Sequence, residues 1–239
     1  MTSRRRMPNA GAWPRRGQVW RSSEVYPEAT DFLVISCDDW NQRPVNSVLG
    51  VEVAEGADDE VTRYAPVIDV AGVRRAVFVD TILPVPLAGL AQTGVRLAAD
   101  AMAEVDQLLD EMLAVGTGSR PRVGRPTRYP FRGNVRFADL QIPGEGTKPV
   151  VVVSSEAFAG ELDYRLVVAC RATSNPANPH DYDVVLSGGR AGKAVCSDLQ
   201  TVSMNRVTDR TPQRGMVDRG ELEAIMTKVR RLVGITSDL

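Results

Sequence analysis

The chain has 239 residues, of which 43% are hydrophobic, and a formal net charge of −1. This length allows one or two domains, each with a buried core. The first sixteen residues contain five arginines and no apolar run long enough for a signal peptide, and no later run reaches membrane-spanning length. These features argue against a secreted or membrane-spanning protein, and we expect a cytoplasmic one.

Charge is distributed unevenly along the chain. Residues 1–16 and 117–136 carry five and six arginines and no acidic residue, whereas residues 17–116 have a net charge of −11. The remainder, from residue 137, is close to neutral. A polyanion would meet the two basic segments first and would be repelled by the acidic first half. No row of aromatic residues alternates with these arginines, so a stacking platform for single-stranded nucleic acid is not indicated.

The cysteines and the histidine do not form a pattern typical of metal or redox sites. Cys37, Cys170 and Cys196 are too few and too unevenly spaced for a disulfide framework, and their apolar flanks predict reduced core residues. His180 has no nearby cysteine and no second histidine with which to share a metal ion. We therefore expect neither a metal site nor a cofactor.

The most informative stretch is a loop that leads into a continuous valine run. Gly146 to Pro149 is followed by Val150 to Val153, which predicts a strand buried on both faces. Lys148, one of only three lysines in the chain, lies where this loop meets the strand. Most loop lysines are solvated surface residues, and this segment alone favours neither that role nor a functional one for Lys148.

The chain contains an internal repeat at a constant offset of 118 residues. Leu33 to Ser36 aligns with Val151 to Ser154, and further matches join Trp40 to Phe158, Tyr64 to Tyr182, and Asp80 to Asp198. A constant offset over this distance indicates duplication. Each copy ends in a helical pattern of apolar residues, comprising Val105, Leu108, Leu109, Met112 and Leu113 in the first and Leu222, Ile225, Met226, Val229 and Leu232 in the second.

Each repeat has several short, valine-rich strands separated by turn residues, with a helix only near its end. This pattern favours a small, partly closed antiparallel barrel over a parallel sheet. We expect a basic tail at residues 1–16, a first repeat at 17–116, an arginine-rich exposed linker at 117–130 and a second repeat at 131–239. The predicted fold class is mainly β, with two tandem domains.

The second repeat, from about Arg132 to Ile235, resembles the MazF/PemK family of toxin endoribonucleases. Three motifs carry the resemblance, namely Arg-Gly-Asn-Val at 132–135 with Gly-Thr-Lys-Pro at 146–149, an apolar strand ending in Thr173 and Ser174, and Ser-Asp-Leu-Gln-Thr-Val-Ser at 197–203. The resemblance implies an SH3-like β-barrel with a closing helix in each repeat. Because toxins of this family act as homodimers, it also implies a monomeric chain in which the two repeats form an intramolecular pseudo-dimer.

The resemblance implies a site on the second repeat. The family's catalytic arginine is Lys148 here, its catalytic threonine is Thr173, and the arginine of its third motif is Gln200. We predict Lys148 and Thr173 as catalytic residues and Arg171, Ser174, Gln200 and Arg132 as substrate-binding residues. The first repeat has Thr30, Glu55 and Ile82 at the matching positions and should be inactive.

Metal-free cleavage of RNA uses the ribose 2′-hydroxyl as nucleophile, so the protein must move protons and stabilise a phosphorane with added negative charge. An arginine presents a planar fork that matches phosphate oxygens, whereas a lysine is a compact cation. Lys148 would therefore replace the arginine without being equivalent to it. The resemblance implies single-stranded RNA as substrate and a cognate antitoxin as a candidate protein partner, and the hydropathy pattern predicts no membrane partner.

Two other functions stay open. Lys148 and Gln200, which depart from arginine, together with the acidic first repeat, favour a non-catalytic relative that binds RNA or a protein. A gyrase inhibitor of the CcdB type shares the fold, and its action would rest on the end of the last helix, Arg230 to Ile235. Gly234 in that segment is equally typical of a helix C-cap.

Overall fold

The computed structural model describes residues 13–23, 29–55, 63–70, 72–114, 129–142, 144, 146–163, 165–187, 192–208 and 215–235. Two compact units divide the chain, residues 1–105 and residues 106–239, and each is described by itself. Most of the predicted basic tail, and the predicted linker apart from residues 129 and 130, lie outside the described residues.

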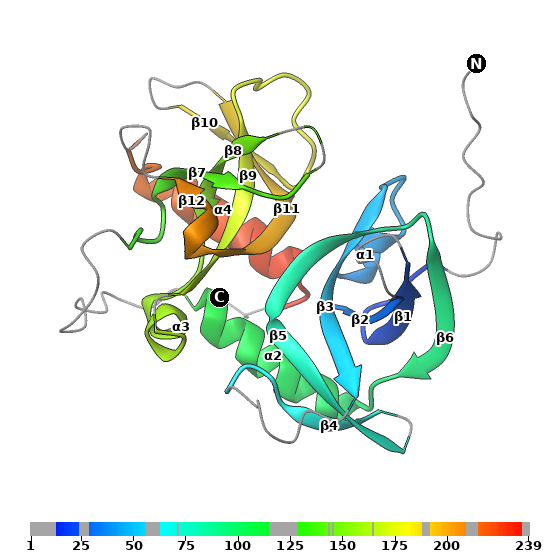
Figure 1. Cartoon of the computed structure of the whole chain (residues 1–239). Helices are drawn as coiled ribbons and strands as arrows, with labels where there is room; N and C mark the ends of the chain where they lie inside the picture. Colours follow the sequence, from blue (N-terminus) through cyan, green and yellow to red (C-terminus); the bar gives the residue numbers. More distant parts are fainter. Residues whose placement is uncertain are drawn as a thin grey trace. The chain divides into compact units, whose positions relative to one another are not determined.

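The first unit is built on a six-stranded antiparallel sheet with the order β4-β5-β3-β2-β1-β6 (Figure 1). Its strands are β1 (Gln18–Ser22), β2 (Thr30–Val34), β3 (Ser47–Glu55), β4 (Val67–Val70), β5 (Val73–Pro86) and β6 (Leu90–Arg96). A short helix, α1 (Asp38–Asn41), follows β2. The core of this unit includes Trp20, Phe32, Val34, Val48 and Val85.

The second unit repeats this order of strands as β10-β11-β9-β8-β7-β12. Its strands are β7 (Val135–Asp139), β8 (Thr147–Val152), β9 (Leu166–Thr173), β10 (Asp183–Leu186), β11 (Gly192–Ser203) and β12 (Val207–Thr208). A short helix, α3 (Glu156–Glu161), follows β8, and a 3-10 turn, η1 (Met204–Arg206), precedes β12. Val150 to Val153 are all buried, which confirms the predicted two-faced burial of this stretch.

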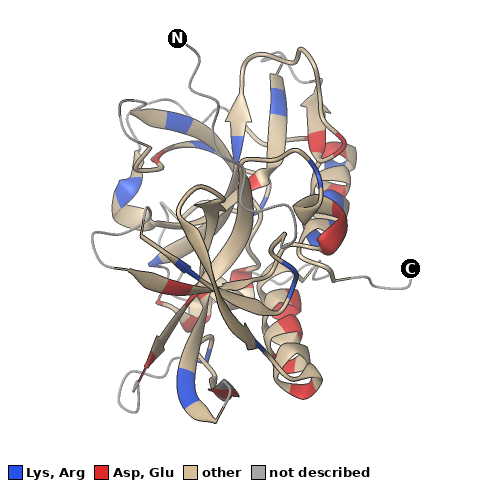
Figure 2. Cartoon of the chain, turned by 90° about the vertical axis from the view of Figure 1, so that its right-hand side faces the viewer, with Lys and Arg blue, Asp and Glu red and all other residues tan. Residues whose placement is uncertain are grey.

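Two longer helices occupy the predicted positions. Helix α2 (Ala99–Leu113) begins in the first unit and ends in the second, and helix α4 (Arg219–Leu232) packs against β10 and β11. Acidic residues but no basic ones lie along α2, whereas α4 carries both (Figure 2). Asp218 and Glu221 form a reciprocal capping box that starts α4, and Gly234, with φ of 71°, follows its end as predicted.

The predicted barrels are wrong in one respect, because both sheets are open. A barrel closes only when its two edge strands pair, and the described residues show no pairing of β4 with β6 or of β10 with β12. These edges are short or polar: β4 and β10 have four residues each, β12 has two, and β6 is largely exposed. Such edges offer too few ladder hydrogen bonds and too little apolar surface to draw the sheet closed.

Within the described residues, none of the helices has the length and the apolarity needed to cross a lipid bilayer. Cys170 and Cys196 are buried and Cys37 is half-buried, and none of the three forms a disulfide.

Candidate functional site

Strands β8, β9 and β11 bring three polar side chains into one row near one end of the second sheet. Val150 on β8 pairs with Arg171 on β9. Two residues further along these antiparallel strands lie Lys148 and Thr173, and Thr173 pairs in turn with Lys193 on β11. Because alternate residues of a strand share a face, Lys148, Thr173 and Lys193 lie on the same face of the sheet.

The neighbouring row adds a third cation and a carboxylate to this face. Val195 on β11 pairs with Arg171 on one side and with Asp183 on β10 on the other. Arg171 and Asp183 therefore lie on the face that carries Lys148, Thr173 and Lys193. The register of four strands thus concentrates charged groups at this end of the sheet.

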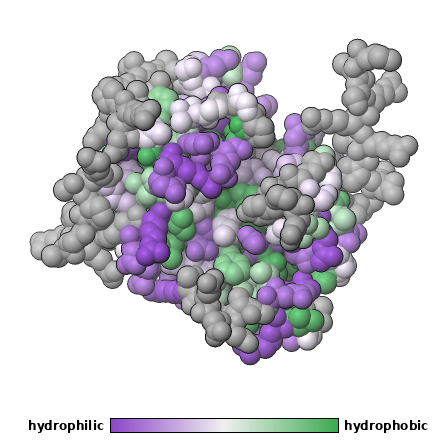
Figure 3. Space-filling view, in the orientation of Figure 1, coloured by the Kyte–Doolittle hydropathy of each residue, from purple (hydrophilic) through white to green (hydrophobic). Residues whose placement is uncertain are grey.

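These side chains line a pocket of about 520 Å³. It contains four of the residues predicted from the sequence, Lys148, Arg171, Thr173 and Ser174, and also His180, Asp183 and Lys193. Hydrophilic residues gather over the strands of the second unit in the face seen in Figure 3. The pocket can therefore receive an anionic ligand in contact with a threonine hydroxyl and several cations.

Arg171 is held in place by an ion pair with Asp198. Its Nε lies 2.6 Å from Asp198 Oδ2, and the two side chains are 33% and 19% exposed. The β9–β11 register shifts between Val195 and Leu199, so Asp198 belongs to an irregular stretch of β11. The ion pair gives Asp198 a structural role at this irregularity.

A second ion pair joins Lys193 to Asp183. Lys193 Nζ lies 2.7 Å from Asp183 Oδ2, and the side chains are only 11% and 1% exposed. Sequence reasoning missed both residues. The scarcity of lysine was the available signal, because Lys193 is another of the three lysines in the chain and lies in the register row of Lys148.

Gly192, at the start of β11, allows close approach of the chain beside the site. A Cβ at this position would lie 2.2 Å from the carbonyl oxygen of Thr173. Real carbon and oxygen atoms do not come this close without a shift of the backbone. Glycine therefore lets β11 run against the end of β9 that carries Thr173.

The other two predicted substrate-binding residues lie elsewhere. Gln200 is half-buried on β11, pairs with Ala169 and does not line the pocket. Arg132 lines a different pocket of about 250 Å³ with Glu111 and Ser154. Its guanidinium donates hydrogen bonds to the carbonyl oxygens of Ser154 and Ala114, and burial lowers its pKa to about 10, with a contribution from Arg230. These contacts are typical of a structural arginine.

Potential metal ligands are scattered in the described part of the chain. Nowhere in it do three or more histidine, cysteine, aspartate or glutamate side chains group closely enough to hold an ion. The pocket offers cations and hydroxyl groups, which suit phosphate oxygens rather than a metal ion.

Residues 131–233 match the family model described as PemK-like, MazF-like toxin of type II toxin-antitoxin system. This segment contains every residue that lines the 520 Å³ pocket. This match confirms the resemblance to the PemK/MazF-like family that was predicted from the sequence for the second repeat.

Several solved structures are similar to the chain. An endoribonuclease in complex with its cognate antitoxin, from a mycobacterial species, has 24% identity and a TM-score of 0.37, with coverage of 46% of this chain and 98% of that chain. A chain of the MazE-MazF structure (Form-II) from Deinococcus radiodurans has 22% identity and a TM-score of 0.37, with coverage of 45% of this chain and 98% of that chain. The Mycobacterium tuberculosis toxin MazF-mt6 has 15% identity and a TM-score of 0.35, with coverage of 44% and 99%. Comparison with curated proteins gave no match.

Proposed function

We propose that the chain is a toxin-type endoribonuclease that cleaves single-stranded RNA in the pocket of its second unit. The observation that carries this proposal is the row of Lys148, Thr173 and Lys193 within the segment that matches the toxin family. The ribose 2′-hydroxyl attacks the adjacent phosphorus and the bond to the 5′-oxygen breaks, which leaves a 2′,3′-cyclic phosphate. No metal ion takes part in this proposed reaction.

Each named residue has a separate role in this reaction. Lys148 places a compact positive charge beside the phosphorane, whose oxygens carry more negative charge than the starting phosphodiester. Thr173 donates its hydroxyl proton in a hydrogen bond to a non-bridging oxygen. The ion pair with Asp198 holds the guanidinium of Arg171 in place. Arg171 therefore strengthens the positive field in the pocket without moving toward the substrate.

The first unit has different residues at the positions that correspond to Lys148, Thr173 and Lys193. At the offset of 118, Thr30 replaces Lys148, Glu55 replaces Thr173 and Arg75 replaces Lys193. Glu55 and Arg75 pair across β3 and β5, just as Thr173 and Lys193 pair across β9 and β11. Arg75 is bound by two carboxylates, from Asp31 and Glu55, each at 2.9 Å. This copy therefore binds no RNA phosphate, and one chain has one catalytic centre.

The shared strand order and the conserved offset support tandem duplication as part of the proposal. One chain would then supply both copies of a family dimer and exist as a monomeric pseudo-dimer. Light scattering should give the mass of a single 26.0 kDa chain at micromolar concentration. A stable mass of two chains would contradict this arrangement. The family description also makes a cognate antitoxin the expected protein partner.

The test of the function is incubation of the purified chain with a mixed RNA pool in EDTA. Cleavage should proceed in the chelator, and enzymatic mapping of the new 3′ ends should find cyclic phosphates. Cleavage that occurs only when a divalent ion is added back would contradict the metal-free mechanism. An RNA pool that stays intact under both conditions would contradict the proposal that the chain is a nuclease.

One observation favours a second candidate, a non-catalytic RNA- or protein-binding relative. Two cations of the pocket, Arg171 and Lys193, are already paired with carboxylates. Binding of intact RNA without cleavage would indicate this function. The third candidate, a gyrase inhibitor acting through the end of α4, gains no support, because Arg230 at that end pairs with Asp110 at 2.6 Å.

A further inference from the structure

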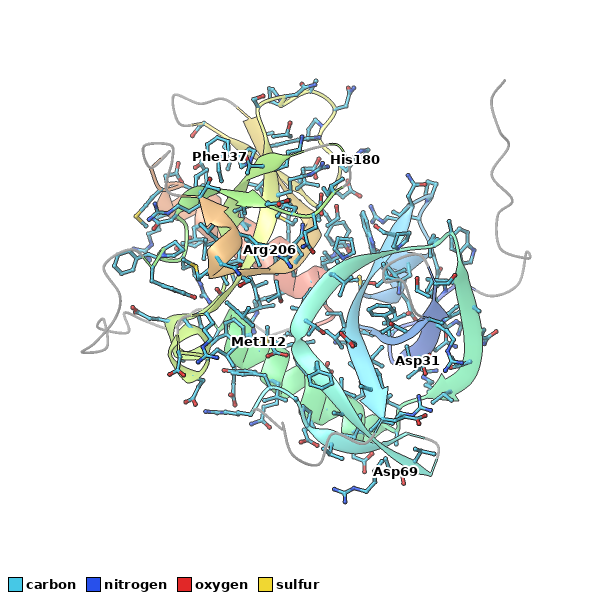
Figure 4. All side chains as sticks on the ribbon, viewed as in Figure 1. Asp31, Asp69, Met112, Phe137, His180 and Arg206 are labelled. Atoms are coloured by element: carbon cyan, nitrogen blue, oxygen red, sulfur yellow. The ribbon has the colours of Figure 1, made fainter. Side chains whose placement is uncertain are left out.

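His180 is the only histidine in the chain, and it lines the pocket that contains Lys148 and Thr173. It lies on the exposed loop between β9 and β10, where Figure 4 labels it. The family resemblance assigns no role to this position. Its location beside the proposed catalytic residues nevertheless allows its imidazole to reach a ligand in the pocket.

The loop that carries His180 is tied to the sheet by a buried carboxylate. The backbone N–H of His180 donates to Asp183 Oδ2 at 3.0 Å. The Asp183 side chain is 1% exposed, and Lys193 Nζ lies 2.7 Å from the same oxygen. A carboxylate buried to this extent needs its cation and its N–H donor, so this contact fixes the backbone at His180.

Lys193 fixes the middle of the same loop. Its Nζ also donates to the carbonyl oxygens of Asn178 at 3.2 Å and of Ala177 at 3.4 Å. With Asp183, these two carbonyl groups give the ammonium group three acceptors, one for each proton. An exposed polar loop is thereby held at two places, and the position of His180 relative to the pocket is determined by side chains from β10 and β11.

The proposed reaction requires a proton at the leaving 5′-oxygen, because an alkoxide leaves poorly. Four charged groups line the pocket with His180, namely Lys148 on β8, Arg171 on β9, Asp183 on β10 and Lys193 on β11. Arginine and lysine side chains hold their protons more tightly than imidazole does, and the carboxylate of Asp183 is engaged as an acceptor. Imidazole is the side chain suited to giving up a proton near neutral pH.

We propose that His180 is the general acid of this site and that Asp183 and Lys193 are its positioning residues, an inference that rests on the proposed nuclease function. As the 2′-oxygen bonds to phosphorus, its proton leaves to water. The electron pair of the breaking bond between phosphorus and the 5′-oxygen goes to that oxygen, which takes a proton from the imidazolium. Neutral His180 is then reprotonated from solvent.

The test compares an ordinary RNA with the same RNA carrying sulfur in place of the bridging 5′-oxygen at the cleavage site. A thiolate leaves without a proton, so it bypasses the need for a general acid. His180→Ala should slow cleavage of the oxygen RNA at saturating concentration by about 100-fold or more. It should cleave the sulfur RNA at close to the wild-type rate. An equal loss on both substrates would overturn the general-acid role.

The pH profile provides an independent readout. Wild-type kcat/KM should fall on the alkaline side as the imidazolium is lost, and this fall should be absent from His180→Ala. Lys193→Arg keeps the cation but changes its geometry, so it should lower kcat, leave KM nearly unchanged and keep the alkaline fall. A wild-type kcat in Lys193→Arg would show that Lys193 does not act through His180.

Asp181→Asn is the matched control, because Asp181 is exposed, adjacent to His180 and outside the pocket lining. This variant should cleave both RNAs at the wild-type rate at saturation. If the wild type cleaves neither RNA, the proposed nuclease function is contradicted. If the wild type cleaves the oxygen RNA and His180→Ala cleaves it equally fast, only the proposed role of His180 is contradicted.

Discussion

Arg171 and Asp198 form an ion pair of 2.6 Å in the second unit, and Asp80, the counterpart of Asp198 at the repeat offset, has Val53 where Arg171 would be. Asp80 is 8% exposed, and its Oδ1 has no hydrogen-bond partner among the described residues. Burial raises the pKa of Asp80 to about 6, although a backbone hydrogen bond opposes the rise. The carboxylate of Asp198 is thus stabilised by its partner in the second unit, whereas the carboxylate of Asp80 is destabilising in the first unit.

Asp80→Asn should stabilise the chain at pH 7 and above. Because the pKa of the Asp80 carboxyl is raised from 3.8 to about 6 in the folded state, its ionisation costs about 3 kcal/mol more there than in the unfolded state. The wild type should therefore lose stability as the pH rises from 4 to 6, and the asparagine variant should lack this contribution. Urea unfolding of both proteins across that range measures the difference.

Asp198→Asn is the matched change in the second unit, and its effect on stability should have the opposite sign. It leaves Arg171 without its carboxylate in a partly buried place, so we expect a loss of about 1–2 kcal/mol. Stabilisation by both substitutions, measured at pH 7, would contradict the different environments assigned to Asp80 and Asp198.

Lys148→Ala should reduce RNA cleavage about 100-fold or more, because it removes a charge placed beside the phosphorane. Lys148→Arg restores the residue type found in the family and should hold or raise the rate. Single-turnover cleavage of a defined RNA measures both changes. The account of Lys148 fails if the alanine variant cleaves as fast as the wild type.

Gly192→Ala should destabilise the second unit and lower activity together. Its Cβ would lie 2.2 Å from the carbonyl oxygen of Thr173, so β9 or β11 must move at this proposed catalytic residue. Gly220→Ala, in helix α4, is the control. Its Cβ meets nothing closer than 3.5 Å, and alanine favours the helix, so stability should rise by about 0.5–1 kcal/mol. Thermal unfolding and cleavage assays on both variants check these outcomes.

Arg132→Ala should separate stability from function. Its guanidinium donates to the carbonyl groups of Ser154 and Ala114, which lose their donor in the variant, at a cost of about 1–3 kcal/mol. Because Arg132 does not line the 520 Å³ pocket, RNA affinity at a temperature where the variant is folded should not change. A selective loss of RNA affinity would support the substrate-binding role that the sequence predicts for Arg132.

Much of the fold could be predicted from local pattern. The two helices follow from apolar residues at helical spacing, and the buried β8 follows from four consecutive valines. Sheet closure could not be predicted, because it depends on whether distant edge strands such as β4 and β6 pair. Each strand looks alike in sequence whether its outer edge is paired or open.

In the candidate site, too, some residues could be predicted from the sequence and others could not. Lys148, Thr173, Arg171 and Ser174 follow from motifs within one strand or turn, and the structure brings them to one pocket. Lys193 and Asp183 enter it through cross-strand register, which no motif specifies, and His180 enters it through a loop fixed by those two residues. Arg132 also belongs to a motif, but it contacts Ser154 and lies outside this pocket. The motif could not predict this, because it does not indicate which side of the sheet its residues occupy.

The most direct test of the central claim is cleavage of an RNA that lacks a single 2′-hydroxyl. Once a cleavage site has been mapped in EDTA, the same RNA is made with deoxyribose on the 5′ side of that bond. The account predicts complete resistance at that bond, with unchanged cleavage at other sites and with Lys148→Ala slow at all of them. Cleavage of the deoxyribose-containing bond at the original rate would contradict attack by the 2′-hydroxyl and, with it, the proposed function of the pocket.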